Sequence, residues 1–441
     1  MLRAVGVLVG GTATAHAITA LSMPIVTRLY APTDMSLLAI FASLLQILYV
    51  AICLRFDIAL SLPESDEEAA NVLAAGALSA AILSSCLMIL VLVSPLSLYQ
   101  RFGYEGFVPY AWMLPPAVFV AGLYSLAQFW FVRRRAFRAI ANSRISQSAA
   151  SAAAQLSLGA AGLGPIGLIV GYILNSGAGL IMLGARFLGT ERGLLSAVNL
   201  ASIRRAWRDH HRFPRYSAAE ALANTAAIQF PVVLIAAMAA KPEAGYLTLA
   251  LYVMQAPMSL IGTAISQVYL AEAPERHRGG TLGVFTANIL GHLVKAGVGP
   301  IILIGIVSPQ AFGVLFGADW ERAGTLVAWM TPWFVMQFLA VPVSMALHVT
   351  GSQRAALVLQ LAGLGWRVGA VWWVGIYASR WISEAYATTG FLFYAAYLVV
   401  LLRRVGMRAR DLLPALRRAT LTTAAWAFLG FAIAAGFCLI G

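Results

Sequence analysis

Long apolar segments recur along the whole of this sequence, and they limit what the chain can fold into. A run of about 20 apolar residues is long enough to cross a bilayer as a helix. With 61% apolar residues and a mean hydropathy of +0.82, the chain lacks the composition of a soluble globular protein. We predict an all-α polytopic membrane protein with thirteen spans, at residues 4–29, 35–56, 67–95, 107–132, 142–162, 164–186, 214–240, 244–270, 281–307, 322–349, 354–377, 382–402 and 419–440.

The lysine and arginine residues divide unequally between the two sides that alternating spans create. If the N-terminus is cytoplasmic, 23 of the 30 fall in or beside cytoplasmic segments and five fall on the opposite side. Cytoplasmic loops of membrane proteins carry such an excess. The bias therefore predicts a multi-pass protein with a cytoplasmic N-terminus. It also accounts for most of the net charge of +13, so we expect no nucleic-acid partner.

The polar segments leave little room for a catalytic domain. The longest one on the far side is expected at Ser308–Glu321. All three cysteines, Cys53, Cys86 and Cys438, lie in apolar segments, so we expect neither a disulfide framework nor a metal site. A phosphate-binding loop of the G-x-x-x-x-G-K-[ST] type is also missing, which argues against direct coupling to ATP. We expect no enzyme activity, no metal and no cofactor.

One long cytoplasmic connection, residues 189–212, divides the chain into halves of six spans each. It mixes arginines with leucines and Trp207, which indicates a helix lying along the membrane surface; it either recruits a lipid headgroup or serves as a basic linker. We predict bundles at 1–210 and 211–403, followed by a basic linker and one extra helix at 404–441. The turns at Pro32 and Pro242, which open the second and eighth spans, are similar and hint at a repeat.

An acidic run at Glu64–Glu68 precedes the third span. Ser65 followed by Glu68 matches the S-x-x-E capping box, and Asp66 and Glu67 fall in the first helical turn, where acids are favoured. Capping is the preferred interpretation, ahead of a ligand-binding role.

Two basic residues lie near the middle of predicted spans. Lys295 shares one helical face with Asn288, His292 and Gly299, at spacings of i, i+4, i+7 and i+11. Arg367 shares a face with Gln360 and Gly363. A charge at this depth costs about 2.5–3.5 kcal/mol on insertion scales unless it faces protein or water. These stripes favour a cationic, water-filled cavity that holds an anion; the alternative is a structural ion pair.

Other ionisable residues have two readings each. His16, near the middle of the first span, and His292 either line the cavity or make interhelical hydrogen bonds. Glu220 and Asp57 are either coupling sites for a cation or counter-charges to a cavity base. Arg28 and Arg55, at span ends, fit snorkelling anchors. The positive potential of a cavity lined by these basic residues attracts anions and suits a pyrophosphate group.

The stretches Pro24–Phe41 (PIVTRLYAPTDMSLLAIF) and Arg55–Asn71 (RFDIALSLPESDEEAAN) resemble the Wzx-type polysaccharide biosynthesis proteins. These are lipid-linked oligosaccharide flippases of the multidrug/oligosaccharidyl-lipid/polysaccharide (MOP) exporter superfamily. Ser36 replaces the family's glycine after the Pro-x-Asp turn, and an odd number of spans departs from the family pattern.

The resemblance implies two six-helix bundles around a central cavity, as in MOP and MATE proteins, with one extra C-terminal helix here. It implies a protein of the bacterial inner membrane that moves undecaprenyl-pyrophosphate-linked repeat units outward by alternating access. The lipid-linked oligosaccharide, membrane lipids and other polysaccharide-assembly proteins would then be its partners. Carried over to this chain, the cationic cavity residues would be Arg28, Arg55, Lys295 and Arg367.

Three other functions are open. A cation-coupled multidrug antiporter should carry a carboxylate in an early span, and the first span here has none. A lipid II flippase also needs a cationic cavity but would be expected to have fourteen spans. A membrane polysaccharide polymerase or glycosyltransferase needs sizeable external loops, which are not predicted. Flippase is the preferred interpretation.

Overall fold

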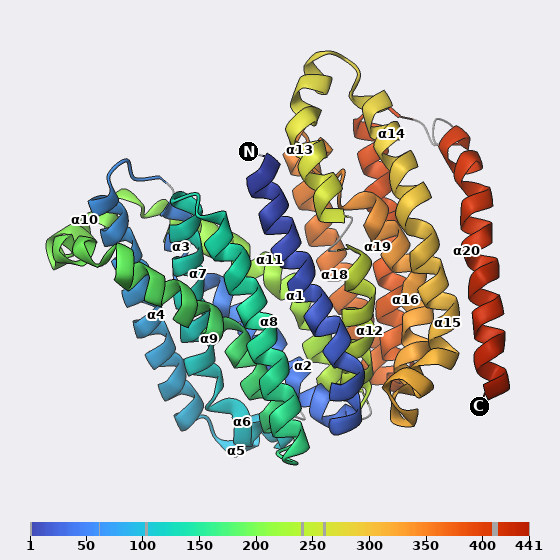
Figure 1. Cartoon of the computed structure of the whole chain (residues 1–441), viewed down its shortest axis with the longest axis horizontal. Helices are drawn as coiled ribbons and strands as arrows, with labels where there is room; N and C mark the ends of the chain where they lie inside the picture. The colour runs from blue at the N-terminus through green and yellow to red at the C-terminus, as the bar shows by residue number, and fades with distance from the viewer. Residues whose placement is uncertain are drawn as a thin grey trace. The chain divides into compact units, whose positions relative to one another are not determined.

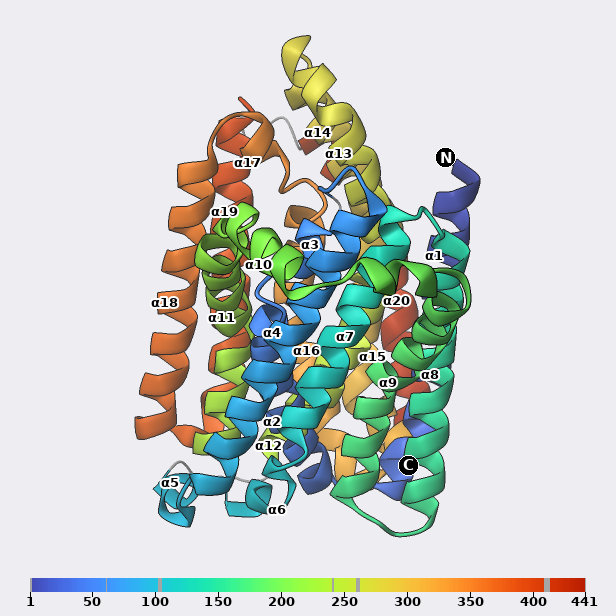
Figure 2. The same cartoon turned by 90° about the vertical axis from the view of Figure 1, so that its left-hand side faces the viewer.

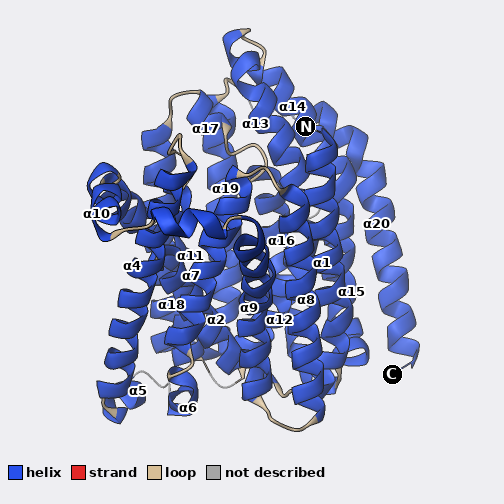
Figure 3. Cartoon of the chain, turned by 60° about the vertical axis from the view of Figure 1, so that its left-hand side comes forward, coloured by secondary structure: helices blue, strands red, loops and turns tan. Residues whose placement is uncertain are grey.

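The computed structural model describes residues 2–60, 62–101, 105–239, 242–258, 262–407 and 413–440 (Figure 1). Within these ranges the chain forms helices joined by turns and loops, without a strand (Figure 3). Nine helical segments of the described residues are long and apolar enough to cross a membrane. The prediction of an all-helical, multi-pass membrane protein is therefore confirmed.

The chain divides into two compact units, Met1–Ala237 and Met238–Gly441. The predicted grouping into two bundles of six around a central cavity, with boundaries at 210 and 403, stays a prediction. In the first unit the elements are α1 (Leu2–Leu29), α2 (Pro32–Ile52), α3 (Phe56–Ala59), α4 (Asp66–Val93), α5 (Leu96–Arg101), η1 (Glu105–Phe107), α6 (Val108–Ala111), α7 (Leu114–Arg133), α8 (Phe137–Ala160), α9 (Pro165–Thr190), η2 (Arg192–Ala197), α10 (Leu200–Asp209), η3 (Phe213–Ser217) and α11 (Ala218–Met238).

In the first unit, α8 packs lengthwise against both α1 and α9, and α7 packs against α2, α4 and α9 (Figure 1). Small residues allow the closest approaches: a side chain at Gly11 of α1 would collide with Ala141 of α8. Buried aromatic residues fill the space between α3, α4 and α7, among them Phe56 and Trp130. This close packing of small and large residues is what holds helices together in a bilayer, where lipid is as apolar as leucine.

The predicted surface helix is present as α10. It crosses the helix axes of the first unit at an angle (Figure 2) and packs against α4. Trp207 contacts Phe56 of α3, with ring centroids 5.1 Å apart, while Leu200 and the neighbouring arginines are exposed. A helix with one packed face and one charged face fits the interfacial position predicted for this connection.

The second unit consists of α12 (Glu243–Pro257), α13 (Thr263–Arg278), α14 (Leu282–Leu293), η5 (Val294–Val298), α15 (Gly299–Phe316), η6 (Ala318–Trp320), α16 (Glu321–Ala340), α17 (Ala346–Val349), α18 (Gln353–Tyr377), η7 (Ser379–Trp381), α19 (Ile382–Arg404) and α20 (Leu413–Ile440). Here α16 packs between α15 and α19, and the C-terminal helix α20 packs on α15 (Figure 1). The middle of the predicted eighth span, residues 259–261, lies outside the described residues.

One predicted loop is wrong. The segment Ser308–Glu321 was expected to be an external loop, but α15 continues through Pro309 to Phe316. Proline lacks an N–H group and usually marks a helix end. Here Ser308 stays in the helix, buried, and its hydroxyl donates to the Ile304 carbonyl. The connection between α15 and α16 is therefore shorter than predicted.

Candidate functional site

Lys295 lies in a π-helical turn, η5, between α14 and α15. Its side chain is exposed, as are those of Asn288 and His292 on the preceding turns, so these three residues share one face. His292 is oriented by a 2.7 Å hydrogen bond between Nδ1 and the Asn288 carbonyl. An exposed lysine within a membrane-crossing helix needs water or an anion beside it.

Gly299 does not belong to this polar face, contrary to the prediction. It is buried, and an added Cβ would lie 2.2 Å from Cδ1 of Trp426 on α20. The π turn supplies the reason, because it holds one residue more than an α-helical turn and rotates everything that follows it. The polar stripe therefore ends at Lys295, and the helix beyond it packs against α20.

Arg367 is only 7% exposed and is held by aromatic rings. Its guanidinium carbon lies 4.3 Å from the ring centroid of Phe393 and 5.8 Å from that of Tyr394, both on α19. Gly363 permits this approach, since a Cβ there would lie 2.1 Å from Phe393. The Nε atom is buried and has no hydrogen-bond partner among the described residues. Gln360 of the same predicted stripe is exposed.

The candidates of the first unit lie in different environments. Arg28 and His16 are exposed on α1. Arg55 is half-buried in the turn between α2 and α3, with a left-handed backbone (φ 63°) and a buried Nε that lacks a partner in the described chain. Asp57 is 6% exposed, and its carboxylate accepts bonds from the Ser125 hydroxyl at 2.8 Å and the Ile58 amide at 2.9 Å. The side chain of Glu220 lies outside the described residues.

A chain of hydrogen bonds joins α2, α9 and α11 in the first unit. Gln229 donates to Gln46 at 3.0 Å and accepts from Ser43 at 3.3 Å, and Gln46 in turn donates to the Tyr172 hydroxyl at 3.5 Å. Only Ser43 and Gln46 stand out as a polar pair in the sequence of α2. Their partners on α9 and α11 follow from the packing of the helices.

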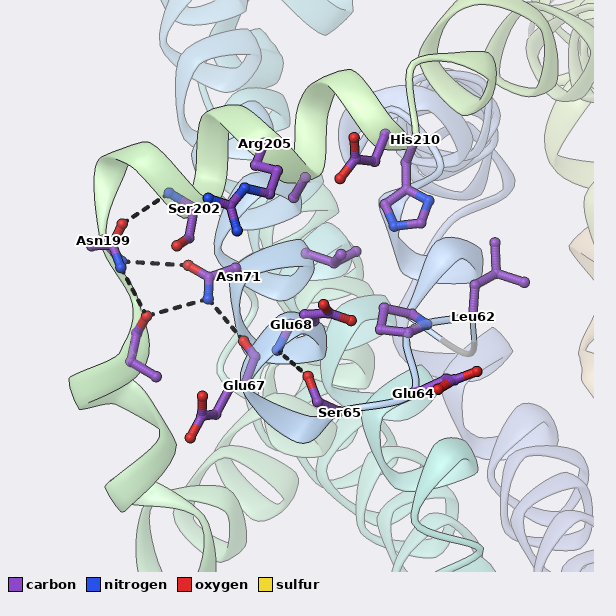
Figure 4. Close-up of a pocket in the computed structure, with 15 residues that line it drawn as sticks. Leu62, Glu64, Ser65, Glu67, Glu68, Asn71, Asn199, Ser202, Arg205 and His210 are labelled. Carbon is purple, nitrogen blue, oxygen red and sulfur yellow. Dashed lines mark hydrogen bonds between the residues drawn. The ribbon is translucent and has the colours of Figure 1, made fainter.

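A pocket of about 700 Å³ opens between the start of α4 and α10 (Figure 4). Its ionisable lining residues are Glu64, Glu67, Glu68, Arg205, Asp209 and His210. The predicted cap is confirmed: the Ser65 hydroxyl accepts a 3.2 Å bond from the Glu68 amide. Among the described residues, no group of three or more acids, histidines or cysteines is placed to hold a metal ion.

Asn71 also lines this pocket. Its amide nitrogen donates to the carbonyls of Glu67 at 2.8 Å and Ala197 at 3.2 Å, and its oxygen accepts from the Asn199 amide at 3.4 Å (Figure 4). Asn199 caps α10 by accepting from the Ser202 amide at 2.8 Å. Asn71 thereby ties α4 to the start of α10.

Two arginines at the end of α7 fix the loop in front of α4. Arg133 donates to the carbonyls of Leu60, Pro63, Glu64 and Ser65, and Arg134 pairs with Asp66 at 2.8 Å and Glu191 at 2.6 Å. Burial lowers the pKa of Arg134, but the two carboxylates outweigh it and raise the pKa on balance. The acidic run is thus anchored by ion pairs at Asp66, its central residue.

In the second unit, Arg322 of α16 pairs with Glu243 of α12 at 2.8 Å and with Glu384 of α19 at 2.6 Å. This three-residue cluster is not apparent from the sequence. A usable signal does exist, because all three residues begin spans that are predicted to start on the same side of the membrane.

Comparison with known proteins places the chain in a family. A family model described as polysaccharide biosynthesis protein matches residues 25–325. No curated protein matches the chain by sequence.

Solved structures agree on the fold. A structure of the lipid II flippase MurJ in an inward closed conformation aligns over 100% of this chain and 98% of its own, with a TM-score of 0.73 and 12% identity. An inward-facing multidrug resistance MATE transporter of the MOP superfamily aligns over 90% and 94%, with a TM-score of 0.58 and 15% identity. A MOP superfamily transporter from Pyrococcus furiosus aligns over 92% and 96%, with a TM-score of 0.56 and 16% identity.

Proposed function

The chain belongs to the polysaccharide biosynthesis protein family and has the fold of MOP superfamily transporters and flippases, and from this premise we propose that it moves a polyprenyl-pyrophosphate-linked oligosaccharide across the membrane. The repeat unit crosses without chemical change, from the cytoplasmic to the outer leaflet of the bacterial inner membrane, with the N-terminus of the protein in the cytoplasm. The resulting lipid-linked sugar then serves surface polysaccharide assembly.

The exposed polar stripe of Asn288, His292 and Lys295 is the observation that carries this proposal. A lysine ammonium at this depth is stable only with water or an anion beside it. A pyrophosphate offers several oxygens that accept charge-assisted hydrogen bonds, and the amide of Asn288 and the imidazole of His292 can add neutral ones. We assign Lys295 the role of principal phosphate ligand.

Arg367 takes a different part in the same proposal. The Phe393 ring stacks on its guanidinium, and we propose that an anion binds along the N–H edge of the plane. Two parallel N–H bonds to one phosphate fit that edge. Arg28, Arg55, His16 and Gln360 remain proposed cavity residues, and Glu220 and Asp57 remain proposed coupling groups.

Native mass spectrometry of protein purified gently from its own host tests the function. Wild-type protein and Lys295→Arg should carry a polyprenyl-pyrophosphate glycan, and Lys295→Ala should lose it. Arg380→Ala is the matched control, because Arg380 is exposed but lies over Trp381 at a helix end, away from the stripe. A bound lipid II molecule would identify lipid II, and not an oligosaccharide repeat unit, as the substrate. A bound cationic drug-like molecule would contradict the proposal.

A further inference from the structure

Two glutamine side chains meet in the first unit, each in the interior of a helix. Gln46 belongs to α2 and Gln229 to α11, and their network reaches Tyr172 of α9. Both α2 and α9 are long and apolar enough to cross a membrane. Lipid offers no hydrogen-bond partner to a neutral amide. An amide in this position is therefore stable only beside protein, water or a polar ligand.

The two amides use only half of their hydrogen-bonding capacity within the described part of the chain. Nε2 of Gln229 donates to Oε1 of Gln46 at 3.0 Å, and Oε1 of Gln229 accepts from the Ser43 hydroxyl at 3.3 Å. Nε2 of Gln46 donates to the Tyr172 hydroxyl at 3.5 Å. A primary amide has two N–H donors and an oxygen with two lone pairs. Each glutamine therefore keeps one donor and one acceptor for a further partner.

These remaining groups are accessible. Gln46 is exposed and Gln229 is half-buried, whereas Ser43 is buried. Tyr49, one turn after Gln46 on the same face of α2, is 36% exposed. The bond from Gln46 to Tyr172 is longer than the usual range of about 2.7–3.2 Å, so a ligand can replace it at little cost. A network that only joined helices would bury its amides between them.

We propose that Gln46 and Gln229 bind hydroxyl groups in the sugar part of the transported lipid. A sugar hydroxyl both donates and accepts, and each amide offers one group of each kind. The network of Ser43, Gln46, Tyr172 and Gln229 contains no carboxylate, ammonium or guanidinium. It therefore selects by hydrogen bonding and not by charge. This inference rests on the proposed function and adds a neutral subsite to the cationic one.

Charged ligands fit the amide pair less well than a sugar does. A pyrophosphate binds more strongly to a cation such as Lys295 than to neutral N–H donors. A sodium ion needs a shell of several oxygens. The Oε1 atoms of Gln46 and Gln229 already accept hydrogen bonds, and no carboxylate takes part in the network. The pyrophosphate is thus assigned to the stripe of Lys295, and the sugar to the amide pair.

Titration of the full-length protein with two lipids, followed by native mass spectrometry in a detergent without a sugar headgroup, tests the subsite. One lipid is undecaprenyl pyrophosphate, and the other is the undecaprenyl-pyrophosphate-linked glycan extracted from the host. The wild type should bind the glycan-bearing lipid about tenfold more tightly. The double substitution Gln46→Leu and Gln229→Leu should abolish this preference and leave the affinity for undecaprenyl pyrophosphate unchanged. Gln310→Leu, at an exposed glutamine of α15, is the matched control and should keep the preference.

A single substitution keeps the test decisive if the double variant does not fold. Gln46→Leu leaves the bond between Ser43 and Gln229 in place and should lower the preference about threefold. Lys295→Ala should weaken the binding of both lipids alike, which separates the two subsites. An unchanged preference in the folded glutamine variants, or an equal loss of both lipids, would overturn this inference and leave the proposed function standing. A wild type that binds neither lipid would overturn the proposed function, and this inference with it.

Discussion

Arg133, at the end of α7, reaches Asp66 in the first turn of α4, with Nη2 and Oδ1 3.2 Å apart, while the same guanidinium binds the carbonyls of the loop between α3 and α4. One side chain thus binds a run of backbone carbonyls, including that of Ser65, which also accepts from the Ala69 amide of α4. The loop is held in one conformation by a cation that lies outside it.

We predict that Arg133→Gln destabilises the first unit by about 2–3 kcal/mol, because several charge-assisted hydrogen bonds are lost together, two of them to partly buried carbonyls. The thermal unfolding of the purified protein measures the change. Arg276→Gln is the control: Arg276 pairs with Glu272 one turn away, and both are about half exposed (50% and 46%). That exposed pair should contribute less than about 0.5 kcal/mol. Equal losses in the two variants would contradict the role given to Arg133.

We predict that Gly363→Ala disrupts the stack of Arg367 on Phe393. The new Cβ would lie 2.1 Å from the Phe393 ring, and relieving that overlap should cost about 1–3 kcal/mol. Gly365→Ala and Gly369→Ala are controls on the same helix, where an added Cβ meets nothing within 4 Å. Thermal stability and glycan binding should both fall in Gly363→Ala alone. Similar losses in the control variants would show that α18 does not tolerate an added methyl group in general, so the losses would not report on the stack of Arg367 and Phe393.

Arg367→Lys should fold but bind substrate at least tenfold more weakly, a loss of about 1.4 kcal/mol. A lysine keeps the charge but has neither the flat surface that stacks on Phe393 nor the paired N–H groups that grip a phosphate. Surface polysaccharide levels in a complemented host and lipid retention by native mass spectrometry measure the effect. Full export by Arg367→Lys would mean that a point charge suffices there.

Asn71→Ala should destabilise the contact between α4 and α10 by about 1–3 kcal/mol, because it removes two hydrogen bonds, to the Ala197 carbonyl and from the Asn199 backbone amide, each worth about 0.5–1.5 kcal/mol. Asn199→Ala removes the cap of α10 and should cost about 1 kcal/mol. Limited proteolysis in the segment between α9 and α10 reports both changes. We predict that Asn71→Ala has the larger effect. A larger effect of Asn199→Ala would mean that the cap of α10 stabilises this contact more than Asn71 does.

The helical membrane fold could be predicted from the sequence because span length and apolarity are local properties. The cap at Ser65 could be predicted for the same reason, since residue 68 lies one turn away. Lys295 and Arg367 also stood out, because a charge in an apolar segment needs no knowledge of its neighbours to be noticed.

The remaining features depend on contacts between helices. Nothing in the α19 sequence shows that Glu384 meets Arg322, since that pair exists only if α16 and α19 are neighbours. The polar stripe was extended to Gly299 because a uniform helix was assumed, and a single π turn breaks the periodicity. The segment Ser308–Glu321 was predicted to be a loop, although the helix runs through Pro309 to Phe316.

Lys295 lies within the π turn at Val294–Val298, and the helix packs through other residues before and after that turn. Such a turn contains one residue more than the α-helical turn it replaces, so deleting a single residue converts it into regular helix and leaves the contact faces on both sides in phase. Leu290 before the turn and Gly299 after it would keep their buried positions. A one-residue deletion therefore tests the position of Lys295 more specifically than a substitution does. It removes the π turn that positions the ammonium group and keeps the packing contacts of α14 and α15.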